Sequence, residues 1–264
     1  MTPLAHLNND PNHVFVATPY GPGYWVPRGD YVEDTVVRGA KNKGYNNFLK
    51  FMKPAARTVC DIGANIGEIT WALSHFCQHI HAFEPVTDTF RLLEKNIEQN
   101  AIANVTAYNK GVGAVHETAL ISLSSNTCGA NARINNFGRS RAKTQAMDII
   151  PLDSLNLTQV DIMKIDVEGY ELDVLRGAEQ TIVRDKPIIQ LEVYEPALKR
   201  ARRDIKDIYD WMIQRDFAAY YVKSRKITAE GAEYTRVPKC IERFFVHKSI
   251  AVGAEVPKTV RVLE

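Results

Sequence analysis

The residues best suited to chemistry in this sequence are acids at the ends of two apolar segments. DIMKIDVEGYE at 161–171 contains Lys164 and Asp166, and a second apolar segment ends near Glu192. Side chains alternate along a strand, so Lys164 and Asp166 share one face. A carboxylate in an apolar cleft becomes a better base as its pKa rises, and a neighbouring cation keeps it ionised. We therefore predict Asp166 as a general base or substrate-orienting group, with Glu192 second and Lys164 as their charge partner.

Other interpretations of these acids stay open. Glu168 shares the strand face of Asp166, but it could instead cap a helix starting near Gly169, where an acid offsets the helix dipole. Lys164 and the acids could also form a buried ion-pair network without a catalytic role. Acids at one strand end can hold a divalent ion through oxygen ligands, although we predict no metal site.

A glycine-spaced turn predicts a ligand site nearer the N-terminus. The apolar segment 59–62 breaks into the pattern DxGxNxG at 61–67, and an apolar stripe with helical spacing follows. A strand that turns into a helix exposes backbone amides, which bind polar or anionic ligands. The pattern is not the GxGxxG of dinucleotide enzymes, because the third glycine has no match. An acid before the first glycine would instead meet a cationic amino group. The residues expected at this site are Asp61, Gly63, Asn65, Ile66 and Gly67.

Another acid ends the next apolar segment. The strand expected at 79–84 ends in Glu84, 23 residues after Asp61, and Pro85 follows it. An acid there can accept both ribose hydroxyls of a nucleoside. The competing interpretation has Glu84 capping the next helix. Because the segment follows DxGxNxG, we expect Glu84 and Pro85 at a ribose.

The stretch from about 58 to 195 resembles the FkbM family of S-adenosylmethionine-dependent methyltransferases, within the class I Rossmann-like group. The segments that carry the resemblance are DIGANIGEIT at 61–70, FEP at 83–85, LDSL at 152–155, KIDVEGYELDVLRGA at 164–178 and PIIQLEV at 187–193. The resemblance implies S-adenosylmethionine as the cofactor and S-adenosylhomocysteine as its product, with Asp166 and Glu168 among the cofactor contacts. It also implies backbone contacts to the adenine from the turn NKGVG, through Asn109, Gly111 and Val112.

Strands and helices alternate along the chain, which predicts a mainly parallel sheet covered by helices. With the resemblance, we expect a three-layer α/β fold of the class I methyltransferase type, with a mostly parallel seven-stranded sheet, a C-terminal antiparallel hairpin and helices on both faces. A helix is expected near 199–214 from the spacing of its apolar residues. The strands are expected near 57–62, 79–84, 104–109, 119–124, 160–166, 187–193, 218–223 and 241–247.

Both ends of the chain extend beyond this core. The N-terminal extension is rich in aromatic residues, Gly and Pro, and we expect a hairpin between 14–17 and 24–26 followed by a helix. Its Tyr20, Tyr24 and Trp25 could form a substrate lid, but packing on the domain edge is the favoured interpretation. The expected parts are an N-terminal extension at 1–52, an S-adenosylmethionine-binding methyltransferase domain at 53–250 and a C-terminal tail at 251–264.

Two polar segments are candidates for substrate contact. The segment 124–146 is predicted to be a long loop, and such loops in compact domains are more often functional than idle. Asn131 and Arg133 are its candidate substrate contacts, with a solvent-exposed loop as the equal alternative. A basic cluster within 199–206 could contact phosphates, but Asp204 interrupts it, so a solvated helix face is favoured.

Composition agrees with one well-buried domain and restricts the partners, metal sites and cell location that we expect. The chain has 264 residues, 45% hydrophobic, and a net charge of +2, which demands no polyanionic partner. Its four cysteines are scattered without a CxxC pair, so we expect a reduced, cytoplasmic protein without structural zinc. The first residues contain no basic start or apolar stretch, and no run of eighteen apolar residues occurs, so neither a secretion signal nor a membrane span is expected.

The resemblance to the FkbM family implies an S-adenosylmethionine-dependent O-methyltransferase that acts on a hydroxyl of a sugar, glycan or small natural product. Neither a nucleic acid nor a membrane is expected as a partner, and the oligomeric state stays open. Three alternatives are a nucleic-acid methyltransferase acting on a ribose 2′-hydroxyl, a non-catalytic S-adenosylmethionine-binding protein, and a nicotinamide dehydrogenase.

Overall fold

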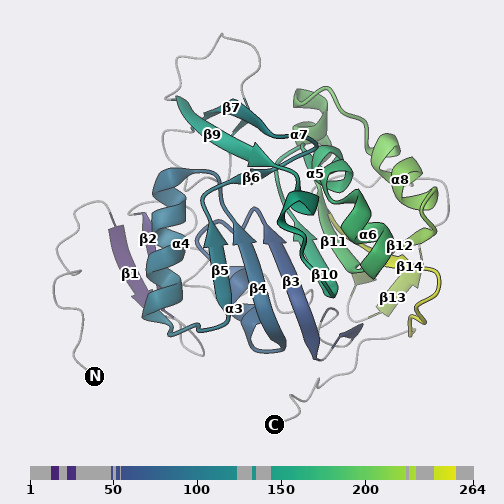
Figure 1. The fold of residues 1–264 in the computed structure, drawn as a ribbon, viewed down its shortest axis with the longest axis horizontal. Helices are drawn as coiled ribbons and strands as arrows, with labels where there is room; N and C mark the ends of the chain where they lie inside the picture. Colours follow the sequence, from purple (N-terminus) through teal and green to yellow (C-terminus); the bar gives the residue numbers. More distant parts are fainter. Residues whose placement is uncertain are drawn as a thin grey trace.

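The main sheet of the protein has eight strands. The structure is a computed structural model, and it describes residues 13–17, 23–27, 49, 52–53, 55–123, 133–134, 144–223, 226–229 and 241–253. The strand order in this sheet is β13-β12-β14-β11-β10-β3-β4-β5 (Figure 1). The strands are β3 (Ala56–Ile62), β4 (Cys77–Phe83), β5 (Val105–Tyr108), β10 (Val160–Ile165), β11 (Ile188–Val193), β12 (Phe217–Lys223), β13 (Lys226–Ala229) and β14 (Ile241–His247).

The pairing confirms the predicted class of fold and corrects one detail. Neighbours from β5 to β11 are parallel, whereas β14 is antiparallel to both β11 and β12. The predicted antiparallel hairpin at the C-terminal side is therefore present. The expected seven strands are eight, because the short segment β13 pairs with β12 at the sheet edge.

Helices cover both faces of this sheet and pack through apolar stripes. Leu73 and Leu93, from α3 (Glu68–Ser74) and α4 (Thr87–Gln99), belong to the core on one face. The core on the other face includes residues of three helices, α5 (Glu171–Gly177), α6 (Glu179–Asp185) and α8 (Ile205–Ile213). The helix expected near 199–214 is two helices, α7 (Glu195–Arg200) and α8. They are separate because Asp204 caps α8, where its side chain accepts a hydrogen bond from the Lys206 amide.

A second sheet lies at the carboxyl ends of the parallel strands, and the sequence did not predict it. Its order is β6-β9-β7-β8, with β6 (Gly111–Val112), β7 (Glu117–Ser122), β8 (Arg133–Ile134) and β9 (Thr144–Ile150). Figure 1 shows β6, β7 and β9 beyond the arrowheads of β3, β4 and β5. The strand expected at 119–124 belongs to this sheet as β7, and the last residues of the expected loop at 124–146 begin β9.

The N-terminal hairpin is present and lies beside α4 (Figure 1). Its strands are β1 (His13–Ala17) and β2 (Gly23–Pro27), paired antiparallel. Asn96 of α4 accepts a hydrogen bond from the Trp25 amide at 2.7 Å and donates one to the Ile66 carbonyl at 2.9 Å. Tyr24 and Trp25 are buried in the cluster that joins the hairpin to α4. Among the described residues, the hairpin therefore packs against the domain edge.

The end of α5 contacts the second sheet through two glycines. A Cβ atom on Gly177 would lie 1.9 Å from the carbonyl oxygen of Gly113, so this approach requires a residue without a side chain. We expect Gly177→Ala to lower the free energy of unfolding by about 3 kcal/mol through overpacking. Thermal unfolding would then show a melting temperature lower by roughly 6–10 °C.

The neighbouring residue provides the control for that substitution. Arg176 precedes Gly177 in α5, and its exposed guanidinium lies 4.0 Å from the Asp173 carboxylate. Arg176→Ala should change stability by less than about 1 kcal/mol. A melting temperature in Gly177→Ala equal to that of Arg176→Ala would contradict the close approach.

Candidate active site

The glycine turn after β3 brings the ends of β3 and β10 into contact. Gly63 has φ +80°, and a Cβ atom there would lie 1.9 Å from the carbonyl oxygen of Asp166. Gly67 has φ +94°, and a Cβ atom there would lie 2.8 Å from the Leu93 side chain. Only glycine accommodates both the left-handed conformation and these distances without strain. The spacing of DxGxNxG thus reflects the close packing of this turn.

Asp61 is fully buried and stabilises the glycine turn through its contacts with Thr70 and Lys164. Its carboxylate accepts a hydrogen bond from the Thr70 hydroxyl at 2.6 Å and lies 3.3 Å from the Lys164 ammonium. Lys164 also donates to the Gly63 carbonyl at 2.6 Å. Lys164 is itself buried, and burial lowers its pKa, but the charges of Asp61 and Asp166 outweigh that effect and raise it. The lysine is therefore a fixed cation beneath the turn.

Glu84, at the end of β4, joins its own loop to the glycine turn. Its carboxylate accepts hydrogen bonds from the Asn65 amide at 3.1 Å and the Val86 amide at 2.8 Å. Burial raises the pKa of Glu84 to about 7, although these amides oppose the effect. Helix α4 has Val86 at its N-cap position and no side-chain cap, so the competing interpretation of Glu84 as the cap of this helix is wrong. A carboxylate has about four lone-pair sites, so two remain for a ligand.

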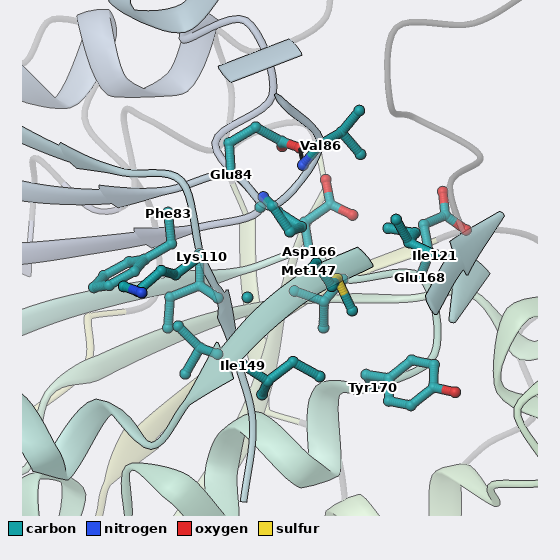
Figure 2. A pocket seen from close by; sticks show the side chains of 16 residues that line it. Phe83, Glu84, Val86, Lys110, Ile121, Met147, Ile149, Asp166, Glu168 and Tyr170 are labelled. Atoms are coloured by element: carbon teal, nitrogen blue, oxygen red, sulfur yellow. Dashed lines mark hydrogen bonds between the residues drawn. The ribbon is translucent and has the colours of Figure 1, made fainter. Parts of the chain in front are cut away.

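A pocket lies between these turns and the second sheet. It is open to solvent, and its empty volume of about 630 Å³ includes part of that solvent space. Figure 2 shows the carboxyl groups of Glu84, Asp166 and Glu168 along one side, with Ile149 and Tyr170 on the other. The lining residues are Ile62, Gly63, Phe83, Glu84, Pro85, Val86, Lys110, Gly111, Val112, Ile121, Met147, Ile149, Asp166, Val167, Glu168 and Tyr170.

Three acids extend from this pocket across the sheet. Asp166 follows β10, and Glu192 of β11 lies opposite Glu242 of β14 in the antiparallel register. Burial raises the pKa of Asp166, Lys164 opposes this, and the Glu192 carboxyl raises it further. Burial, with a contribution from Glu192, also raises the pKa of Glu242 to about 9. The acids are thus close enough to influence each other's charge.

Comparison with protein families identifies the chain. The model of the methyltransferase FkbM domain matches residues 61–219, which is more than half of the chain. The chain belongs to the FkbM methyltransferase family. This confirms the resemblance inferred from the motifs, and the matched region runs from the glycine turn to the first half of β12.

Individual proteins of known name are similar to parts of the chain. Methyltransferase 1 of Beauveria bassiana (strain ARSEF 2860) is 29% identical over 146 residues, covering 46% of this chain and 58% of that protein. Hexuronic acid methyltransferase AglP of Haloferax volcanii is 31% identical over 124 residues, covering 44% of this chain and 48% of that protein. The chain therefore spans about half the length of the curated relatives it matches. The crystal structure of methyltransferase FkbM from Methylobacillus flagellatus KT is similar with a TM-score of 0.49 and 18% identity, covering 72% of this chain and 43% of that chain.

Two FkbM motif acids support the scaffold. Asp153 of the LDSL motif accepts hydrogen bonds from the amides of Gln180 and Thr181, at 2.9 and 3.0 Å, near the start of α6. Glu171 of the EGYE sequence is buried and accepts the Gly169 amide at 2.9 Å. Helix α5 begins at Glu171 without a side-chain cap, so the interpretation of Glu168 as its cap is wrong. Glu168 instead lines the pocket and lies 3.8 Å from the Arg200 guanidinium.

The structure brings many of the predicted cofactor residues to one pocket of this FkbM domain. Those that line it are Gly63, Glu84, Pro85, Gly111, Val112, Asp166 and Glu168. Four others lie behind it: Asp61 and Asn65 support the turn, Ile66 packs against the hairpin, and Asn109 donates to the Glu84 carbonyl at 2.9 Å. Gly67, with its positive φ, ends the turn at the start of α3.

The structure does not place the predicted substrate contacts at the pocket. Asn131 lies outside the described residues, and Arg133 is described only as part of the backbone of β8. Tyr24 and Trp25 are buried away from the residues that line the pocket.

The prediction of no metal site stays a prediction. Over the part of the chain that the structure describes, no three His, Cys, Asp or Glu side chains are grouped as metal ligands. No described helix is long and apolar enough to cross a membrane.

Several residues of the candidate site were not predicted from the sequence. Ile121, Met147 and Ile149 form the apolar wall of the pocket, and Tyr170 completes it. Glu242 was also missed, although it shares one face of β14 with Phe244 and Val246, which are both buried. An acid on a strand face that is otherwise buried is unusual, and this pattern in the sequence could have identified Glu242 as a candidate.

Proposed function

We propose that this FkbM protein transfers the methyl group of S-adenosylmethionine to a hydroxyl of a sugar, glycan or small natural product. The observation that carries the proposal is a single pocket with Glu84 at one end of its polar side and Asp166 next to it. One residue is suited to a ribose and the other to removal of a proton. Both adjoin the glycine turn of the family-matched region.

The pocket residues suit the parts of S-adenosylmethionine. Glu84 would accept the ribose hydroxyls, and the apolar wall with Gly111 and Val112 would enclose the adenine. Asp166 and Glu168 would lie near the cationic amino and sulfonium groups. Asp61 has a supporting role in this proposal, because its carboxylate is engaged by Thr70 and Lys164.

The protein's part in the reaction is positioning and proton removal. A bound sulfonium supplies an activated methyl group, so the acceptor oxygen needs alignment with the methyl carbon and loss of its proton. Asp166 would accept that proton. Its side chain is one-third exposed and lies 3.7 Å from the Lys164 ammonium, which favours its ionised form. Glu192 would orient the acceptor beside it.

The basic residues near α7 favour a small acceptor over a nucleic acid. Lys199 pairs with Glu195 at 2.7 Å, and Arg203 pairs with Asp173 at 2.6 Å. These charges are already offset within the protein. Phosphate binding would require several free cations beside the pocket, whereas the one lysine among the residues that line it, Lys110, lies 3.6 Å from the Asp148 carboxylate. The name of the Haloferax volcanii relative, a hexuronic acid methyltransferase, is consistent with a sugar as the acceptor class.

Transfer of a labelled methyl group tests the proposal. The purified chain is incubated with labelled S-adenosylmethionine and a panel of glycans and hydroxylated metabolites, with RNA as the comparison. We expect label in at least one hydroxylated small molecule or glycan and none in RNA. Label only in RNA, or in no acceptor while the cofactor is bound, would contradict the proposed acceptor class.

Replacing Glu84 tests the cofactor site. Glu84→Gln removes charge-assisted hydrogen bonds to the ribose, so the Kd for S-adenosylhomocysteine should rise at least about tenfold. Because burial raises the pKa of Glu84 to about 7, wild-type binding should tighten as the pH rises through 7 and the carboxyl ionises. Calorimetry at several pH values measures both effects.

The control is an exposed acid of the helix that follows the Glu84 loop. Glu94 of α4 is exposed, so Glu94→Gln should bind S-adenosylhomocysteine as the wild type does. If Glu84→Gln also binds like the wild type, Glu84 does not contact the ribose.

A further inference from the structure

A polar side chain of the second sheet contacts the loop that follows Glu84, and the proposed reaction does not use it. This residue is Gln145 of β9, which is half-buried. Its side-chain oxygen accepts a hydrogen bond from the Thr87 amide at 3.1 Å, and its Nε2 donates to the Pro85 carbonyl at 3.0 Å. The side chain thus contacts the backbone on both sides of Val86.

Val86 links the apolar wall of the pocket to Glu84. Its side chain is buried in a cluster with three residues of the second sheet, Ile121, Met147 and Ile149. Its amide donates to the Glu84 carboxylate at 2.8 Å. A shift of the peptide groups on either side of Val86 would therefore change both the contact with the wall and the position of this carboxylate.

The start of α4 makes the contact with Thr87 important. The first amides of a helix have no partner within the helix, and a polar side chain at the N-cap position commonly satisfies one of them. The N-cap residue of α4 is Val86, which has no polar side chain, and the Thr87 amide follows it. Gln145 supplies an acceptor for this amide from 58 residues away in the chain. Loss of Gln145 would remove that acceptor and loosen the loop.

We infer that Gln145 is a positioning residue for cofactor binding, because it fixes the loop 85–87 and thereby holds the Glu84 carboxylate where the ribose is expected to bind. This inference rests on the proposed function and adds to it a residue that is not among those lining the pocket. A group that contacts a ligand is oriented by the residues that support it. The second sheet then has two roles, since it supplies the apolar wall and orients the acid opposite that wall.

Removal of the two hydrogen bonds tests the inference. Gln145→Met keeps the length of the side chain and can form neither bond, so the Kd for S-adenosylhomocysteine should rise at least about fivefold in calorimetry. The control is Thr144→Met. Thr144 is exposed, and its side chain lies on the opposite face of β9, so this variant should bind like the wild type. Equal Kd values for Gln145→Met and the wild type would overturn the inference and leave the cofactor site standing.

Thr87→Pro breaks the same contact from its other partner. Proline has no amide hydrogen and is favoured at the first position of a helix, which Thr87 occupies, so α4 should keep its start. We expect the Kd for S-adenosylhomocysteine to rise at least about threefold. Adding Gln145→Met to this variant should raise the Kd by less than about a further threefold, because the contact with Thr87 is already lost. A wild-type Kd in Thr87→Pro would overturn the inference even if Gln145→Met did not fold.

A double-mutant cycle separates positioning from general support of the fold. If Gln145 acts through Glu84, adding Gln145→Met to Glu84→Gln should raise the Kd by less than about twofold. The same fold-increase in the wild-type and Glu84→Gln backgrounds would overturn this explanation. If the wild type does not bind S-adenosylhomocysteine at all, the proposed cofactor site fails and the inference fails with it.

Discussion

Asp166→Asn is expected to lower kcat for methyl transfer by at least about 100-fold, because the acceptor hydroxyl then lacks its general base. The substitution keeps the shape of the side chain but removes its negative charge, and with it the ability to accept a proton. Burial and Glu192 raise the pKa of Asp166, and only the ionised form is a base. Wild-type kcat should therefore fall as the pH decreases through this raised pKa. The Asn variant should lose that dependence.

The matched control for Asp166→Asn is an acid outside the pocket. Glu117 of β7 is exposed, so Glu117→Gln should keep wild-type kcat and the same pH profile. Steady-state assays with labelled S-adenosylmethionine measure all three proteins. Equal product from the wild type and Asp166→Asn would remove Asp166 from the mechanism, whatever the control shows.

Lys164→Met is expected to have the largest effect on stability. Lys164 has a side-chain exposure of 7% and pairs with Asp61, which is fully buried. Removing the lysine leaves the Asp61 charge buried and the Gly63 carbonyl without its donor. Loss of one partner of a buried pair costs about 3 to 5 kcal/mol. Chemical denaturation should show this loss, and the melting temperature should fall by roughly 10 °C.

A double variant tests whether charge is the cause. Asp61→Asn removes the buried charge and keeps a side chain that can bond to Thr70. The combined Asp61→Asn and Lys164→Met protein should be more stable than Lys164→Met alone, because no uncompensated ion remains. If the two substitutions destabilise additively, the ion pair contributes no coupling and the account of the turn is incorrect.

The parts of the fold that could be predicted have strong local signals. The strand that leads to DxGxNxG is apolar, and the glycines mark a turn whose positive φ angles at Gly63 and Gly67 follow from their lack of a side chain. Glu84 and Asp166 each end an apolar run, and parallel strands place such ends at one edge of the sheet. Because of this arrangement of parallel strands, Glu84 and Asp166 could be placed in one site from the sequence, although they are about 80 positions apart.

The second sheet could not be predicted because its signals are short or mixed. β6 has only two residues, and β9 alternates buried Met147 and Ile149 with exposed side chains in a stretch that begins in polar sequence. A pattern of that length is equally compatible with a loop. The apolar wall of the pocket was therefore missed.

Two acids show the limit of spacing arguments. Asp61 stands in a motif that predicts ligand contact, but tertiary packing buries it beneath the turn with Thr70 and Lys164. Glu242 has no motif, and it reaches the site through an antiparallel pairing with Glu192, 50 residues away in the chain. Depth of burial and long-range register are set by the whole fold.

Isothermal calorimetry with S-adenosylhomocysteine and with NAD tests whether the pocket between the glycine turn, Glu84 and the second sheet is a site for the adenosyl cofactor. We expect saturable one-to-one binding of S-adenosylhomocysteine to the wild-type protein and no measurable binding of NAD. Absence of binding to S-adenosylhomocysteine, or equal binding of NAD, would contradict it.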